Sequence, residues 1–281
     1  DGVVNIVTGR GSVVGQAMSS HPGIDKLSFT GSTPVGCTVG KTAMDQMKRL
    51  TLELGGKSPV IVFADADIEA AAQALANGVF FNSGQVCDAG TRAYIERSVY
   101  PAFLEALARY TATLKIAPGL DPECFISPMV SQQQQQRVLD YIALGKAEGA
   151  QVHYGGEPLD GPGFYVQPTI FAHCRNDMRI VSEEIFGPVL CARRFASEEQ
   201  AITEANDSRF GLVATVCSAD LDRAERVADA LEVGHVWINS VQAVFVETSW
   251  GGTKGSGIGR ELGPWGLSAY QSVKHVTRCL G

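Results

Sequence analysis

The order of short apolar runs and helical segments is the feature that most constrains this fold. The run 26–30 ends at Gly31, the run 50–54 alternates apolar and polar residues before a Gly-Gly pair, and a helical stretch at 35–47 lies between them. A helix that joins two strands in this way returns the chain for a parallel pair with a right-handed crossover. With a further apolar run at 3–7, this order predicts half of a doubly wound, nucleotide-binding sheet.

The alternation continues along the chain and predicts an α/β protein. Hydrophobic residues make up 45% of the 281 residues and charged residues 19%, which suits a globular chain with a sizeable core. We expect strands at 3–7, 26–30, 50–54, 59–63, 92–96, 151–154, 169–171, 189–195, 212–218, 235–238 and 272–279. We expect helices at 13–20, 35–47, from 65 or 67 to 81, 101–115, 131–148, 198–206 and 221–231.

The charge balance and the cysteines exclude several classes of protein. With 23 Lys and Arg against 30 Asp and Glu, the net charge is -7, so no basic field attracts nucleic acid or an anionic membrane surface. The seven cysteines form no CxxC pair and the histidines show no metal-ligand spacing, which argues against a disulfide framework and a metal site. Without a basic leader or a long apolar run, the sequence indicates a soluble cytoplasmic protein.

The segment 29–36 reads as a strand, a glycine turn and a helix. Gly31 and Gly36 allow the backbone to approach a pyrophosphate, and the start of the helix offers free N–H groups and the positive end of its dipole. An ordinary turn between a strand and a helix has the same composition. This segment alone therefore leaves a phosphate site and a plain connection both open.

Glu53 lies in an apolar strand, directly before Gly55 and Gly56. This position is the carboxyl end of a parallel strand, where such sheets bind ligands. A carboxylate held there with a raised pKa can act as a general base. The alternative is an acid on the polar face of an edge strand.

Cys87 differs from the other cysteines in its surroundings. Gly84 and Gly90 flank it, so backbone N–H groups are available near its thiol, as a nucleophile facing a developing oxyanion requires. Most free cysteines are small core residues, and that interpretation stays open on these grounds alone. No histidine lies near Cys87 in the sequence, so nothing supports a Cys-His protease.

Glu184 and Phe186 stand just before a Gly-Pro turn. A carboxylate can accept hydrogen bonds from ribose hydroxyls, and an aromatic ring can press on a nicotinamide ring. As a lone motif this segment is equally typical of a surface turn.

Together, these segments resemble the aldehyde dehydrogenase superfamily from residue 1 to about 278. The sequence at 53–59 is similar to the family's glutamate signature, and 81–87 with Arg92 is similar to its cysteine signature. The interval between the Glu and the Cys, 87 minus 53 or 34 residues, is that of the family. Two more landmarks, at 184–188 and 250–261, follow in the family's order.

The resemblance implies a role for each motif residue. Cys87 forms a thiohemiacetal with an aldehyde, a hydride passes to the nicotinamide of NAD, and Glu53 activates the water that hydrolyses the remaining thioester. The presence of Glu53 argues against the branch that transfers the acyl group to coenzyme A. NADP remains an alternative cofactor. The implied cofactor-binding residues are Gly31, Ser32, Gly36, Leu54, Glu184 and Phe186.

Within the family, the segments 250–252 and 259–267 resemble enzymes that act on betaine aldehyde or ω-amino aldehydes. Trp250 can supply a π face for a substrate cation, although a packing role is equally open. Phe81 is expected in the same substrate pocket, at a position where several such enzymes carry Trp.

The resemblance also implies a domain organisation. Residues 1–55 would be part of an NAD(P)-binding domain, 56–250 the catalytic domain, and 251–281 a Gly-rich return segment with an oligomerisation strand at 272–279. Family members are longer, so we expect the carboxyl-terminal portion of an enzyme that forms a homodimer or homotetramer, inactive without the amino-terminal part. The alternatives are a non-catalytic oligomerising remnant and a thioester or ester hydrolase that needs no cofactor.

Overall fold

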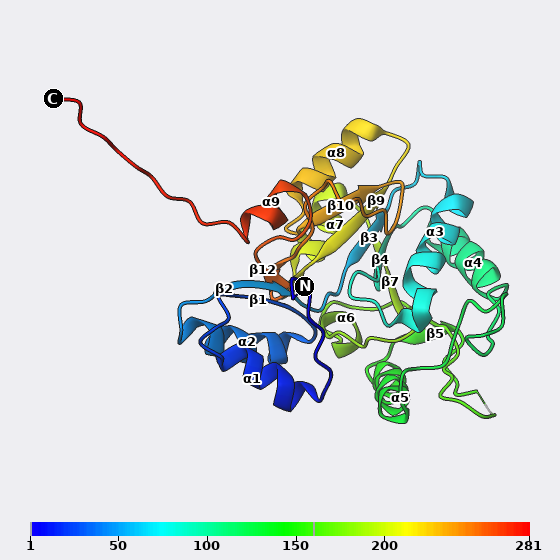
Figure 1. Cartoon of the computed structure of the whole chain (residues 1–281). Helices are drawn as coiled ribbons and strands as arrows, with labels where there is room; N and C mark the ends of the chain where they lie inside the picture. Colours follow the sequence, from blue (N-terminus) through cyan, green and yellow to red (C-terminus); the bar gives the residue numbers. More distant parts are fainter. Residues whose placement is uncertain (1, 160) are drawn as a thin grey trace.

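The computed structural model describes residues 2–159 and 161–281, which form a smaller and a larger part, each built on its own sheet (Figure 1). The smaller part has a three-stranded sheet in the order β1-β2-β12, and the larger part has a seven-stranded sheet in the order β10-β9-β3-β4-β7-β6-β5. The large sheet consists of β3 (Pro59–Val62), β4 (Arg92–Glu96), β5 (Gln151–Tyr154), β6 (Thr169–Ala172), β7 (Val189–Phe195), β9 (Val213–Cys217) and β10 (His235–Ile238). The predicted α/β class is therefore confirmed.

In the smaller part, β1 (Lys26–Thr30) and β2 (Arg49–Glu53) pair in parallel and are joined by α2 (Thr33–Met44). The short π-helix η1 (Gly11–Gly15) and α1 (Gln16–Ser20) precede them, and α1 packs against α2. The third strand, β12 (Gly257–Ile258), comes from the Gly-rich segment and pairs antiparallel with β2. The end of the chain thus completes the sheet that the beginning starts.

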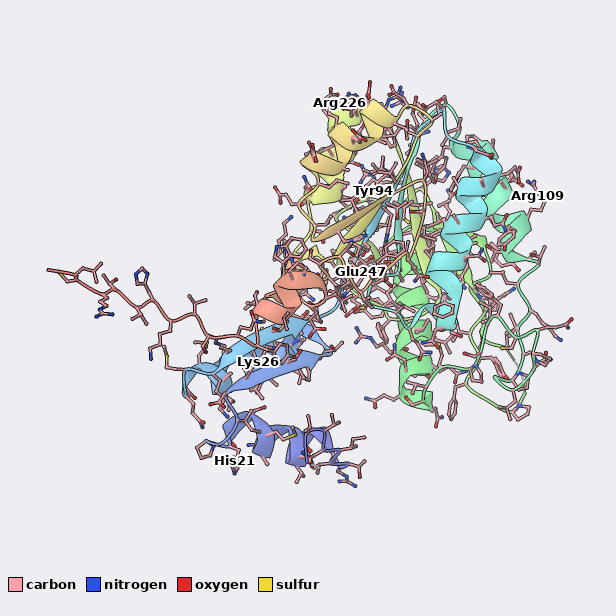
Figure 2. All side chains as sticks on the ribbon, turned by 45° about the horizontal axis from the view of Figure 1, so that its top comes forward. His21, Lys26, Tyr94, Arg109, Arg226 and Glu247 are labelled. Atoms are coloured by element: carbon pink, nitrogen blue, oxygen red, sulfur yellow. The ribbon has the colours of Figure 1, made fainter. Side chains whose placement is uncertain are left out.

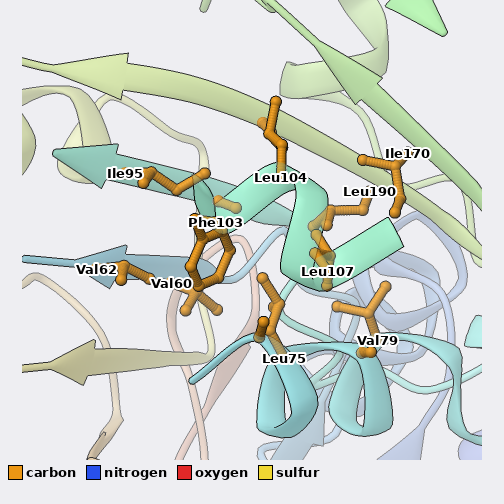
Figure 3. Close-up of a cluster of buried hydrophobic side chains, with 14 of the residues drawn as sticks. Val60, Val62, Leu75, Val79, Ile95, Phe103, Leu104, Leu107, Ile170 and Leu190 are labelled. Atoms are coloured by element: carbon orange, nitrogen blue, oxygen red, sulfur yellow. The ribbon is translucent and has the colours of Figure 1, made fainter. Parts of the chain in front are cut away.

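Helices cover both faces of the large sheet. On one face, α3 (Ile68–Phe80) and α4 (Tyr100–Thr111) pack against side chains such as Val60 and Val62 (Figure 3). On the other face, α7 (Glu198–Asn206) and α8 (Leu221–Ala230) pack against Ile61, because successive side chains of a strand point to opposite faces.

Figure 2 shows the result of this layering, with Arg109 on α4 and Arg226 on α8 on opposite sides of Tyr94 in the sheet. The helices α5 (Gln132–Ala147) and α6 (Arg179–Ser182) build a further core against the β6 and β7 side. Within residues 2–159 and 161–281, no helix combines the length and the apolar character needed to cross a membrane.

Local capping explains where several helices begin. The Asp67 side chain accepts a hydrogen bond from the Ala70 N–H at 3.1 Å, so α3 begins after Asp67 rather than after Asp65. Ser131 caps α5 in the same way through the Gln134 N–H, at 3.2 Å. Such side chains satisfy one of the orphan N–H groups of the first turn.

Two predicted strands are wrong. The segment 3–7 pairs with no strand among the described residues, and its valines and isoleucine are exposed, Val3 to 92%. The segment 272–279 is likewise no strand: it runs away from the body of the molecule in Figure 1. In both cases the apolar composition suits a strand, but a strand also needs a neighbour for its backbone hydrogen bonds. The sequence analysis also missed β8 (Phe210–Gly211), β11 (Thr253–Lys254), β12, α6 and α9 (Gly263–Ser268).

Candidate active site

A cleft of about 1780 Å³ lies where the smaller and the larger parts meet. Its walls come from the end of β1, the end of β2, the segment before β4, helix α5 and the turn after α6. Most of the residues singled out in the sequence line it, although they lie up to 155 positions apart. They are Gly31, Ser32, Glu53, Leu54, Cys87, Glu184 and Phe186.

The turn after β1 presents the N-terminus of α2 to the cleft. Ser32 is the N-cap residue and its carbonyl accepts the Gly36 N–H at 2.9 Å, but no side chain caps the helix. The first-turn N–H groups are therefore available to an anion. Gly36 itself lies behind the cleft wall, where a Cβ would come within 2.8 Å of Leu54 Cδ1, so a glycine lets α2 pack closely on Leu54.

Glu53 ends β2 and is only 5% exposed. Neither of its carboxylate oxygens has a hydrogen-bond partner among the described residues. Burial, with a smaller contribution from the charge of Glu261, raises the pKa of Glu53 to about 7, and Arg260 opposes the rise. An acid with this pKa is divided between its two forms at neutral pH, which suits a group that must both take up and release a proton.

A strained turn carries Cys87. In η2 (Phe81–Gly84), Asn82 and Ser83 adopt left-handed backbone angles, with φ of 48° and 57°, and Gly84 follows with φ of 70°. A Cβ on Gly84 would collide with the Gly187 carbonyl oxygen, so this turn is pressed against the turn that follows Glu184. Left-handed angles at ordinary residues cost about 1 to 3 kcal/mol each and persist where surrounding structure holds them.

The Cys87 thiol is half-buried and lines the cleft. Burial, with smaller contributions from the charges of Asp88 and Glu184, raises its pKa to about 11. The backbone N–H groups of Cys87 and Asp88 act in the opposite direction. Those two N–H groups are the kind of donor that stabilises negative charge beside a nucleophile.

Glu184 and Phe186 face the same cleft from the turn after α6. The Glu184 carboxylate accepts the Gly56 N–H at 3.1 Å and leaves no room for a side chain at Gly55. Burial raises the pKa of Glu184, and that N–H and the nearby Lys57 lower it. Phe186 is 38% exposed, and its backbone has a left-handed φ of 60°.

Several residues around these groups escaped the sequence analysis. From α5, Gln134 donates to the Phe186 carbonyl at 2.8 Å, and Arg137 donates to the Glu184 carbonyl at 2.7 Å, so the helix fixes the turn that carries both side chains. Gln134 and Arg137 are three positions apart and so lie on one face of a polar helix, which is the sequence signal that could have identified them. Lys57 is 2% exposed, its Nζ has no partner within the described ranges, and burial lowers its pKa.

The two residues expected in a substrate pocket lie outside this cleft. Phe81 is 54% exposed at the start of η2. Trp250 packs in a cluster with Trp237 and Cys87, and its ring centroid lies 6.3 Å from that of Trp237 and 5.8 Å from that of His235. Trp250 and Cys87 therefore share a packing cluster, but only Cys87 also lines the cleft.

The chain is similar in sequence to known proteins. The model of the aldehyde dehydrogenase family matches residues 1–276. The chain is 46% identical to the chloroplastic betaine aldehyde dehydrogenase of Amaranthus hypochondriacus over 99% of its own length and 56% of the relative's. It is also 46% identical to the peroxisomal aminoaldehyde dehydrogenase 2 of Malus domestica, over 98% of this chain and 55% of that one.

Solved structures give the same result. An NAD-dependent aldehyde dehydrogenase from Sinorhizobium meliloti superposes with a TM-score of 0.98 at 41% identity and covers 100% of this chain and 56% of that one. Betaine aldehyde dehydrogenase from Staphylococcus aureus, in complex with NAD+, gives 0.91 at 41% identity over 94% and 53%. The chain spans about half the length of the relatives it matches. The chain belongs to the aldehyde dehydrogenase family.

Proposed function

We propose that the protein oxidises an aldehyde to a carboxylic acid with NAD, using Cys87 as nucleophile and Glu53 as general base. The observation that carries the proposal is the single cleft that both residues line together with an uncapped helix N-terminus and Glu184. The overall reaction converts one aldehyde, one water and one NAD+ into one carboxylic acid, one NADH and one proton.

The described residues fit a dinucleotide. Gly31 and Ser32 would place the pyrophosphate against the uncapped start of α2, whose free N–H groups suit an anion. Leu54 and Gly36 shape that wall, while Glu184 would accept hydrogen bonds from a ribose and Phe186 would lie against the nicotinamide. When bound, NAD supplies the hydride acceptor. The Sinorhizobium and Staphylococcus relatives carry NAD in their names or complexes, and NADP remains the alternative here.

Cys87 forms the first covalent bond. Its thiolate attacks the aldehyde carbon, and the resulting oxyanion of the thiohemiacetal lies near the Cys87 and Asp88 N–H groups. Loss of hydride from that carbon leaves an acyl thioester on the sulfur. Glu53 then takes a proton from water, whose oxygen attacks the thioester carbon, and the thiol of Cys87 leaves as the acid is released.

The substrate class proposed is a cationic aldehyde. The two curated relatives described above are named for betaine aldehyde and aminoaldehydes. In this chain, Trp250 packs against the same buried cluster as Cys87 and can present a π face to a cation, and Phe81 is a second aromatic ring at the start of η2.

We further propose the domain division 1–55, 56–250 and 251–281; the separate three- and seven-stranded sheets support the boundary between the first two. A homodimer or homotetramer is proposed because residues 272–281 are extended and exposed, while β10 is an edge of the large sheet. The seven free cysteines favour a reducing compartment such as the cytoplasm, although relatives bear chloroplastic and peroxisomal names.

The test is NADH formation at 340 nm by the native-length protein with a panel of aldehydes. We expect Cys87→Ala to abolish it, and Glu53→Gln to give one equivalent of NADH per active site before stalling at the thioester. Ester hydrolysis without any NADH would favour the cofactor-independent hydrolase instead. Absence of both activities would favour the oligomerising remnant.

A further inference from the structure

Asp88, the neighbour of the nucleophile, is a buried carboxylate without a counter-charge. It is 8% exposed, and its side-chain contact is a hydrogen bond of 3.3 Å from Gln242 Nε2 to Oδ1. In the part of the chain that the structure describes, no basic side chain comes within 4.0 Å of it. Burying a carboxylate in this way is costly unless a cation joins it.

A strained loop holds Gln242 over this carboxylate. Asn239 and Gln242 adopt left-handed backbone angles, with φ of 50° and 53°. Gln242 also donates to the Gly78 carbonyl at 3.2 Å, and Trp237 Nε1 donates to the Ala243 carbonyl at 2.9 Å. These two hydrogen bonds fix the loop at Gln242 and Ala243, so the group held beside Asp88 is an amide and not a cation.

The same loop ends at Trp250, which packs, as Cys87 does, against the buried cluster of Leu212, Val213 and Trp237. Neither Asp88 nor Trp250 lines the cleft proposed for the cofactor, whereas Cys87 does. Asp88 follows Cys87 directly in the chain, and Trp250 shares its packing cluster, so a carboxylate and an aromatic ring lie near the nucleophile without lining that cleft.

Resting on the aldehyde oxidation proposed above, we propose that Asp88 is a specificity-determining residue that binds the cationic group of an amino aldehyde held at Cys87. The carboxylate accepts N–H hydrogen bonds from the ammonium, as charge-assisted bonds of this kind require. In 3-aminopropanal the nitrogen is three bonds from the aldehyde carbon, so a residue adjoining the nucleophile has the reach. Burial raises the pKa of Asp88, and a bound cation opposes that rise and keeps the acid ionised.

The experiment compares 3-aminopropanal with butanal, its neutral analogue with CH3 in place of NH3+, in the native-length protein. The readout is the ratio of the two kcat/KM values, which cancels any change in Cys87 reactivity that both substrates share. In Asp88→Asn, which keeps an oxygen for Gln242, we expect this ratio to fall about 10- to 100-fold. Gln242→Met keeps the carboxylate, so its ratio should stay within about twofold of the wild-type ratio.

Asp229→Asn, at an exposed position on α8, makes the same change in net charge far from Cys87 and should leave the ratio unaltered. An unchanged ratio in Asp88→Asn, or an equal fall in Gln242→Met, would overturn the inference and reduce Asp88 to an anchor for the loop. In both of those cases butanal oxidation persists, so the proposed function survives. Failure of the wild-type protein to oxidise either aldehyde would instead overturn the proposed function, and this inference with it.

Discussion

Burial raises the pKa of both Glu53 and Cys87, with opposite consequences for their roles. A pKa of about 7 lets Glu53 act as a base near neutral pH. A pKa of about 11 instead keeps the Cys87 thiol protonated, and a thiol is a far weaker nucleophile than a thiolate. The free protein is therefore expected to hold its nucleophile in an unreactive form.

The first prediction concerns alkylation of Cys87 by iodoacetamide in the absence of cofactor. Because the thiolate fraction below pH 11 grows about tenfold per pH unit, the rate should rise by that factor per unit between pH 8 and 10. In Glu184→Gln, a negative charge that raises the Cys87 pKa is removed, so alkylation at pH 8 should be faster. Peptide mass spectrometry follows the site, and the exposed Cys37 monitors the reagent. A rate independent of pH above 8 would contradict this.

The second prediction concerns Glu53 and the free energy of unfolding. The pKa is raised in the folded state, from 4.5 to about 7, so the native protein binds the proton more tightly than the unfolded chain. The stability this gives is present below pH 4.5 and is lost as the pH rises through 7. Each pKa unit corresponds to about 1.4 kcal/mol, so the loss amounts to about 3 kcal/mol.

Glu53→Gln keeps the shape of the protonated acid and cannot ionise. Without cofactor, this variant should be about 3 kcal/mol more stable than the wild-type protein at pH 8, and the difference should shrink towards pH 5. Urea unfolding at the two pH values measures it. A variant less stable than the wild-type protein at pH 8 would mean that the ionised Glu53 is well solvated or paired in solution.

At the scale of elements, the local sequence pattern was enough to predict most of the longer helices and strands. The strand at 92–96, the strand at 189–195 and the helix at 198–206 occur at their predicted bounds, because alternation and capping residues within each segment define them. The two-residue strand β12 could not be predicted, since it exists only by pairing with β2, some 200 residues earlier in the chain.

The site likewise contains residues that local motifs predict and contacts that they do not. Glu53 and Cys87 stand out from their own motifs, and the structure places both at one cleft. The contact between Gln242 and Asp88 joins residues 154 positions apart, so nothing local to either residue signals it. Contacts of this kind depend on how loops from different elements meet at one end of the sheet.

The third prediction tests the contact between the Cys87 turn and the turn that carries Glu184. Gly84→Ala places a side chain at a left-handed φ of 70°. Its Cβ would also clash with the Gly187 carbonyl and with Pro188 N, at 2.7 Å. We expect it to lower the free energy of unfolding by about 2 to 4 kcal/mol. Gly149→Ala has a φ of 90° but open space around its Cβ, and should cost only about 1 kcal/mol. Equal losses in the two variants would show that the turns yield without strain.

At the scale of the whole molecule, the extended segment 272–281, called the tail below, is the feature that the fold of one chain does not explain. Arg49 donates to the Gln271 carbonyl and to Ser272 Oγ, so the start of the tail is held against the smaller part. Beyond it, Val276 and Leu280 are 77% and 86% exposed. Four positions apart in an extended segment, they lie on the same side and form an apolar edge that a second copy could bury.

The fourth prediction is that this edge joins two copies of the protein. If the tail of one copy pairs with the exposed edge at β10 of another, Val276→Asp places a charge in the contact and should shift the native-length protein towards monomer. Sedimentation velocity measures the shift. Leu120→Asp changes a fully exposed residue on another loop and should leave the assembly intact. Assembly that survives Val276→Asp, and also survives a stop after Gln271, would place the interface elsewhere on the molecule.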